Sequence, residues 1–205
     1  MTAEETLRSH FSTALADGGS TGAVGEILLL LSQGVLDGRE FAEIIKKHEL
    51  HREPWFRHQR LDLIIGYVNA LLSDGELDSQ SLKSIKTLKK CLEVAEGDFV
   101  SLRPAEVAAV LTGQLEQILE DDFIDEMEDL RQTELQAAFD LSYDQYLQLT
   151  RAEFERAMAS LQERSELAKR TRDNNSARLL DERIAALNPI YQLAISQPRR
   201  LGALY

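Results

Sequence analysis

The chain has little of what β-rich or disulfide-bonded proteins require. Its 205 residues include one cysteine, four prolines and eleven glycines, and aromatic residues make up only 6%. A single cysteine, Cys91, excludes an intramolecular disulfide framework and a cysteine-rich zinc site. The scarcity of turn residues excludes a β-sandwich or β-barrel, because those folds need a tight turn between most pairs of strands.

Long hydrophobic runs are also missing. The longest is Ile27 to Leu31, far short of the ~20 apolar residues that cross a bilayer. Residues 1–17 lack the apolar segment of a secretory signal. We therefore expect a soluble, cytoplasmic protein in a reducing compartment.

Positive charge is scarce and unevenly placed. The chain has 23 Lys and Arg against 35 Asp and Glu, a formal net charge of −12, which argues against general nucleic-acid binding. Residues 1–150 contain 13 Lys and Arg against 28 Asp and Glu, whereas residues 151–205 contain 10 against 7. This change predicts an acidic body followed by a mildly basic C-terminal appendage.

Helix periodicity is the dominant pattern in the sequence. Apolar residues recur at the i, i+3, i+4 and i+7 spacing of one helix face in Leu61–Leu72 and Leu82–Ala95. Pro104 marks the start of another helix. No segment predicts a strand, and 43% hydrophobic residues suffice for a core. We predict an all-α protein with roughly eight to ten helices.

The C-terminal region predicts a helical hairpin. Residues after Thr150 are rich in helix formers and in alternating charges, and the polar cluster Asp173–Ser176 is expected to divide them into two helices. Asn188 and Pro189 are expected to begin a further short helix.

A short internal repeat indicates how the earlier helices are joined. The shared pattern is leucine, two polar residues, glycine or aspartate, any residue, leucine or isoleucine, and aspartate. It occurs in Leu31–Asp37, Leu72–Asp78 and Leu119–Asp125. The glycines, Gly34 and Gly75, can adopt the left-handed conformation that ends a helix, and the final aspartates can cap the next one. The repeat predicts a compact bundle of pseudo-repeated helix–turn–helix units.

The turns contain more acid than capping requires. Eight of the fourteen residues from Glu116 to Asp129 are acidic, and clustered carboxylates repel one another unless solvent, a basic partner or a hard cation neutralises them. An oxygen-rich turn could hold Ca²⁺ or Mg²⁺, although the segment around Gly75 lacks the ligands of an EF-hand loop. The alternative is that these carboxylates only cap helices and face solvent.

The third repeat and the helix expected after it carry a family resemblance. One stretch is Leu119–Glu128, followed by Leu135, Ala138, Phe139 and Leu141–Asp144, and the other is the turn Leu72–Asp78. Together they resemble the acidic turns and following helix of TerB-like domains. The resemblance covers residues 25–150. It implies an all-α fold and a role in tellurite or other stress responses, bacterial defence or membrane-linked complexes, without enzymatic activity. It also implies divalent-metal binding through Asp74, Glu76, Asp78, Asp121, Asp122 and Asp125.

Two segments are candidates for contact with a protein partner. The basic and aromatic segment Trp55, Phe56 and Arg57 contains residue types that are frequent in binding hot spots; the alternative is that it anchors a loop on the bundle. The C-terminal tail, with Arg199, Arg200 and Tyr205, is basic and then apolar. It is a candidate docking peptide, and the alternative is a frayed end.

These features predict three parts. Residues 1–24 form an N-terminal helix and a Gly-rich linker, residues 25–150 a TerB-like acidic helical domain, and residues 151–205 a C-terminal helical hairpin or docking appendage. We expect a non-enzymatic accessory or regulatory subunit that binds protein partners in a bacterial stress-response or defence system. One alternative is a Ca²⁺- or Mg²⁺-responsive module. Another is an acidic inhibitor or immunity protein that covers a basic site. A homo-oligomer is also compatible with the sequence.

Overall fold

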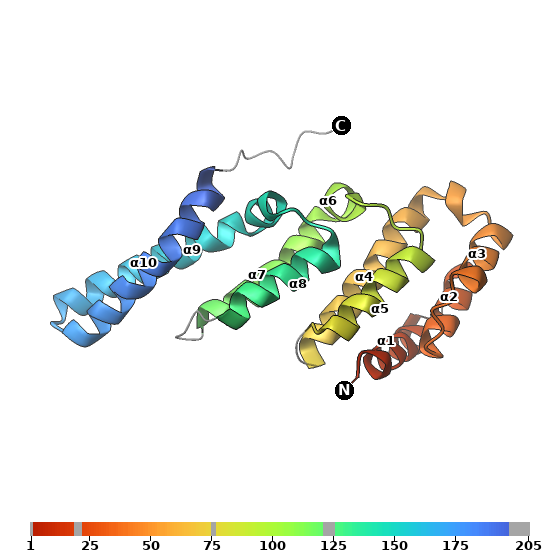
Figure 1. Ribbon diagram of the computed structural model, residues 1–205, viewed down its shortest axis with the longest axis horizontal. Coiled ribbons are helices and arrows are strands. Elements are labelled where there is room, and N and C mark those ends of the chain that lie inside the picture. The colour runs from red at the N-terminus through yellow and green to blue at the C-terminus, as the bar shows by residue number, and fades with distance from the viewer. Residues whose placement is uncertain (1, 19–21, 75–76, 121–125, 197–205) are drawn as a thin grey trace. The chain divides into compact units, whose positions relative to one another are not determined.

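Helices make up all the regular secondary structure in the described part of the chain (Figure 1). The computed structural model describes residues 2–18, 22–74, 77–120 and 126–196, without the side chains of residues 18, 116–120 and 126–132. Within these ranges there is no strand, and the predicted all-α class is confirmed. None of the helices in these ranges combines the length and the hydrophobicity needed to cross a membrane.

The elements follow one another with short connections. They are α1 (Ala3–Gly18), α2 (Ala23–Ser32), α3 (Gly38–Lys47), the 3₁₀ helix η1 (Leu50–Arg52), α4 (Pro54–Asp74), α5 (Ser79–Cys91), α6 (Asp98–Leu102), α7 (Pro104–Glu120), α8 (Glu126–Phe139), α9 (Tyr143–Arg170) and α10 (Asn174–Ser196).

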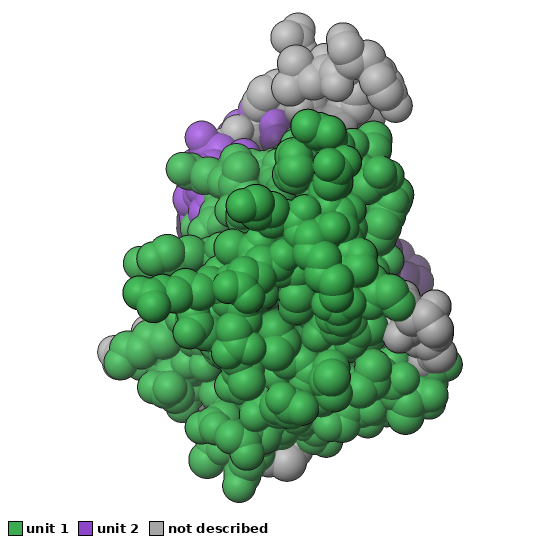
Figure 2. Space-filling model, turned by 90° about the vertical axis from the view of Figure 1, so that its right-hand side faces the viewer, with its two compact units in different colours: residues 1–107, 129–140 green, residues 108–128, 141–205 purple. Residues whose placement is uncertain are grey.

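The chain divides into two compact units (Figure 2). Unit 1 contains residues 1–107 and 129–140, and unit 2 contains residues 108–128 and 141–205. Helix α1 packs on α2 and α4 within unit 1, so the N-terminal helix is part of the acidic body. The predicted boundaries after residues 24 and 150 stay a prediction.

Helix α4 is the central element of unit 1. Pro54 begins it, as suits a residue without a backbone N–H. Its buried residues are Phe56, Leu61, Leu63, Ile64, Ile65, Tyr67, Val68 and Leu71. The Tyr67 hydroxyl donates to the carbonyl of Ala3 at 2.8 Å, and the Thr6 hydroxyl donates to Asp74 at 2.8 Å. Burial raises the pKa of Tyr67 to about 12, so its hydroxyl keeps its proton and fastens α1 to α4.

A buried lysine attaches α8 to α5. Lys89 is 8% exposed, and its Nζ donates to the Asp140 carboxylate at 2.7 Å and to the carbonyls of Ala137 and Ala138 at 3.2 Å. A cation at these last carbonyls satisfies groups that the helix itself leaves unpaired. Lys89 therefore holds the C-terminus of α8 in unit 1.

The first repeat forms the predicted turn. Gly34 has φ of 76°, and its N–H donates to the carbonyl of Leu31 at 2.9 Å. The next residue, Val35, donates to Leu30 at 3.0 Å, which completes the Schellman pattern of a helix end. Asp37 then accepts from the N–H of Arg39 at 2.8 Å and caps α3.

The second repeat is described in part. Asp78 accepts from the N–H of Ser81 at 2.7 Å and caps α5, as predicted. Gly75 and the turn of the third repeat lie outside the described residues, so the likeness of the three units stays a prediction.

The last helix differs from the prediction. Helix α10 runs unbroken through Pro189, where the sequence predicts a separate short helix. A proline removes one backbone hydrogen bond of a helix. Pro189 is exposed, so water can reach the carbonyl that this leaves unpaired. Leu187 and Ala194, on either side, are buried and hold the helix in unit 2.

The Gly34 turn can be tested by substitution. Gly34→Ala should lower the free energy of unfolding by about 1–2 kcal/mol, because a Cβ disfavours the left-handed conformation and would lie 2.5 Å from Nε of Arg8. The matched control is Gly38→Ala at the start of α3, where a Cβ meets no heavy atom within 4 Å. Urea denaturation measures both variants. Equal stability of the two would contradict the turn.

Candidate protein interface

The basic and aromatic segment has one exposed ring. Trp55 is 47% exposed, and its Nε1 donates to Glu53 at 3.0 Å. Phe56 is 2% exposed and packs in the core of unit 1, so this predicted partner residue offers no surface. The side chain of Arg57 is 56% exposed and pairs with Asp98.

Asp98 explains why arginines occur in this segment. Its side chain is 7% exposed and accepts from Arg57 at 3.2 Å, from Arg60 at 2.9 Å and from the N–H of Ala95 at 3.1 Å. A buried carboxylate needs such partners, because an unpaired charge is costly to remove from water. The arginines of α4 thus hold α6, and Trp55 and Arg57 are the exposed candidates of the segment.

The second candidate surface is the hairpin of α9 and α10 in unit 2, which lie side by side (Figure 1). A capping box begins α9, with the Gln145 N–H donating to the Ser142 hydroxyl at 3.2 Å and the Ser142 N–H donating to the Gln145 side chain at 2.9 Å. Arg172 takes the left-handed conformation, with φ of 60°, in the turn after α9. Asp173 accepts from the N–H of Ser176 at 3.1 Å as α10 begins. The predicted hairpin turn is therefore present.

The core of the hairpin follows a heptad spacing. Residues 154, 158, 161, 165 and 168 are buried on α9, with alternating steps of four and three. The pattern continues on α10 at residues 177, 180, 184, 187, 191 and 194. Of these, 177, 187 and 194 are buried and the others are partly buried. Met158, Leu161 and Leu187 form the central cluster, with Leu180, Ile184 and Tyr191 packed against it. Such spacing is typical of two helices packed as in a coiled coil.

One edge of the hairpin is closed by polar contacts. The hydroxyl of Ser165 donates to Asp181 at 2.6 Å, and Nζ of Lys169 donates to the same carboxylate at 2.9 Å. The hydrogen bond from Ser165, followed by that from Lys169, lowers the pKa of Asp181. Ser165 and Lys169 therefore define the side of α9 that meets Asp181.

The opposite side of the hairpin exposes leucines. Leu167 is two residues from both Ser165 and Lys169, which places it about 200° around α9 from each of them. Leu179 is two residues before Asp181 and lies opposite it in the same way. They are 61% and 58% exposed, the two highest values among the large hydrophobic residues that the structure describes. Leu193, two heptads after Leu179, is 49% exposed. We call Leu167, Leu179 and Leu193 the leucine face.

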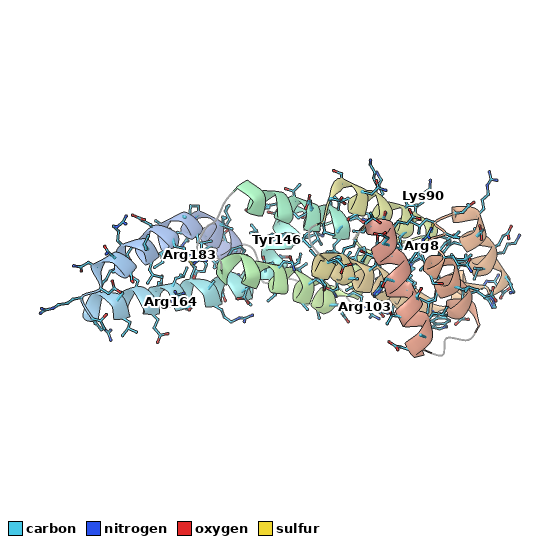
Figure 3. All side chains as sticks on the ribbon, turned by 90° about the horizontal axis from the view of Figure 1, so that it is seen from below. Arg8, Lys90, Arg103, Tyr146, Arg164 and Arg183 are labelled. Atoms are coloured by element: carbon cyan, nitrogen blue, oxygen red, sulfur yellow. The ribbon has the colours of Figure 1, made fainter. Side chains whose placement is uncertain are left out.

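Sequence reasoning missed the leucine face. The signal was available, because these leucines fall one residue before the core positions Ala168, Leu180 and Ala194 and therefore out of the core register. Arg164, three residues before Leu167, was also missed; Figure 3 shows it on α9, with Arg183 on the neighbouring part of α10. The predicted tail residues Arg199, Arg200 and Tyr205 lie outside the described residues.

The carboxylates predicted to bind metal have other partners where they are described. Asp74 accepts from Thr6, and Asp78 caps α5. Glu76, Asp121, Asp122 and Asp125 lie outside the described residues. Elsewhere in the chain, where side chains are described, no group of three or more His, Cys, Asp or Glu residues is placed to hold a metal ion.

Comparisons of the chain with protein-family models, with curated proteins and with solved structures found no match.

The capping role of Asp78 can be tested at two substitutions. Asp78→Ala should destabilise the protein by about 1 kcal/mol, whereas Asp78→Asn should cost less because asparagine also caps helices well. The hydrogen bond from the Ser81 N–H holds the pKa of Asp78 below its ordinary value. Its charge-dependent stabilisation is therefore complete above the pKa of the unfolded chain and is lost as pH falls through the lower folded-state pKa.

Urea denaturation from neutral to acidic pH measures this contribution. The stability difference between the wild type and Asp78→Asn should shrink as the pH falls. Equal destabilisation by alanine and asparagine would contradict the capping role. A melt in EDTA and then with added Ca²⁺ or Mg²⁺ tests the metal hypothesis separately, because a cation that binds only the folded state raises the melting temperature.

Proposed function

We propose that the chain is a non-enzymatic accessory or regulatory subunit that binds a protein partner through the α9–α10 hairpin. The observation that carries the proposal is the leucine face. Single exposed leucines are ordinary on protein surfaces, whereas apolar groups gathered on one face are typical of interaction sites. Leu167 and Leu179 come from the two helices of one hairpin and lie on the same side of it.

The packing of the hairpin supports a role in binding. Each helix uses one heptad stripe to cover the other, and the Asp181 edge is occupied by hydrogen bonds. The leucines of the leucine face lie neither in the heptad stripes nor at the Asp181 edge, so replacing them should lower the stability of the hairpin little. Side chains that contribute little to the fold and are costly to expose are explained best by a partner that covers them.

The biological setting that we propose rests on the sequence resemblance and not on the leucine face. A bacterial stress-response or defence system is suggested by the TerB-like resemblance of residues 25–150. The hairpin lies outside that range, so it would be the part of the chain that selects the partner. Cation binding receives less support, because the described carboxylates Asp74 and Asp78 are engaged within the protein.

The partner can be sought with the full-length chain. Tagged wild type and the double variant Leu167→Ser/Leu179→Ser are produced in the cells that naturally contain the protein, cross-linked, purified and compared by quantitative mass spectrometry. We expect a near-stoichiometric partner whose recovery falls at least about tenfold with the double variant, since hot-spot side chains contribute about 2 kcal/mol or more to binding.

The matched control is Leu29→Ser in α2 of unit 1, which also removes a leucine that is about half exposed, at 48%. It should leave the partner's recovery unchanged. All variants should melt close to the wild type, because exposed substitutions rarely change stability by more than about 0.5 kcal/mol. The proposal fails if no protein is lost selectively from the double variant.

A further inference from the structure

The leucine face has the chemistry to receive a helix. The backbone hydrogen-bonding groups of α9 and α10 are used within the helices, apart from the ends and the site of Pro189. The face therefore offers side chains and no free strand edge. An extended peptide would find no backbone ladder there, whereas an amphipathic helix can place its own apolar stripe on leucines.

The length of the face sets the size of that helix. Leu179 and Leu193 are 14 residues apart on α10, a rise of about 21 Å at 1.5 Å per residue. A partner helix of about four turns would extend along both. Leu167, on α9, widens the face beside Leu179.

The charged side chains of the hairpin determine which charges a partner helix needs on either side of its apolar stripe. Most of the basic side chains near the face are paired within the hairpin. The pairs are Arg156 with Glu153, Lys169 with Asp181, Arg170 with Glu166, and Arg178 with Glu182. These pairs leave little positive charge for a partner to meet.

Arg164 and Arg172 are different. Both are exposed, and neither guanidinium group has a hydrogen bond or ion pair with any residue that the structure describes. Arg164 lies nearly one turn before Leu167, on the side of that leucine nearer to α10. The adjacent acid, Glu163, lies four residues before Leu167, on the side of α9 away from α10. Arg172 lies in the turn that joins the helices.

Docking would remove these guanidinium groups from water. That is costly unless a carboxylate meets them, and rim charges of this kind determine which partner is accepted. We propose that the leucine face binds an amphipathic helix of a partner protein whose apolar stripe is flanked by Asp or Glu. The carboxylates meet Arg164 and Arg172, and the apolar stripe covers Leu167 and Leu179. This inference rests on the proposed function and names the chemistry of the partner.

Two synthetic peptides test the inference with the full chain. Each has about 21 residues, enough for measurable helicity, and the same leucine stripe. One has glutamate on both flanks and the other has lysine. Binding of the fluorescently labelled peptides is followed by anisotropy. The net charge of −12 would by itself favour the lysine peptide, so a preference for glutamate reports local contacts.

The glutamate peptide should bind at least about tenfold more tightly than the lysine peptide. Arg164→Glu should reduce or reverse this preference, and Leu167→Ser/Leu179→Ser should weaken both peptides. The control is Lys83→Glu, which reverses an exposed charge on α5 in unit 1 and should change neither affinity.

Three results would overturn the inference. They are binding of neither peptide, equal or lysine-preferring binding that Arg164→Glu leaves unchanged, and a dimer in sedimentation that the leucine double variant dissociates. The dimer would show that a second copy of the chain occupies the face. If a cellular partner is lost from the double variant but the peptides show no charge preference, the proposed function stands and only the partner's chemistry is wrong.

Discussion

Unit 1 depends on the burial of α4. A helix that is apolar around much of its circumference cannot remain beside water, and eight of the residues in α4 are buried. Burying one such large apolar side chain contributes about 1.5–3 kcal/mol. Helices α1, α5 and α6 all contact α4. Their polar links also converge on it, because Tyr67 holds Ala3 and Arg60 holds Asp98. Asp62 adds two hydrogen bonds from Arg103, at 2.6 and 2.8 Å.

Unit 2 contains a hairpin with a different constraint. Two helices packed against each other can cover only one stripe apiece. Its core includes small or polar residues, such as Ala168, Ala177 and Ser165, and Ser165 is tolerated because its hydroxyl bonds to Asp181. Any apolar residue outside the two stripes must stay in water or meet another molecule. The leucine face is the consequence, and a binding function is the reason we propose for it.

The sequence was sufficient for features that depend on neighbours along the chain. Hydrophobic periodicity predicted the all-α fold class. Short-range chemistry predicted the Gly34 turn, the caps at Asp37 and Asp78, and the start of α7 at Pro104. The candidate site was predicted less well. Trp55 and Phe56 share one motif, yet a step of about 100° around the helix leaves one exposed and the other buried.

Features that depend on distant contacts could not be predicted in this way. Lys89 caps a helix whose end lies about 50 residues away, and Asp98 bonds to Arg60, 38 residues before it. The passage of α10 through Pro189 depends on buried residues on either side. In each case the local pattern was compatible with several structures, and packing selected one.

The charge distribution gives the proposed interface two separate electrostatic effects. The net charge of −12 repels an acidic partner at long range, whereas Arg164 attracts its carboxylates only near contact. Long-range fields act mainly on the association rate, and close pairs act mainly on dissociation. Salt screens both, but it screens the exposed, distant charges most effectively beyond a Debye length of about 8 Å at physiological ionic strength. An acidic helix would therefore associate faster as salt rises and also dissociate faster. A partner held mainly by the acidic body would associate more slowly under the same change.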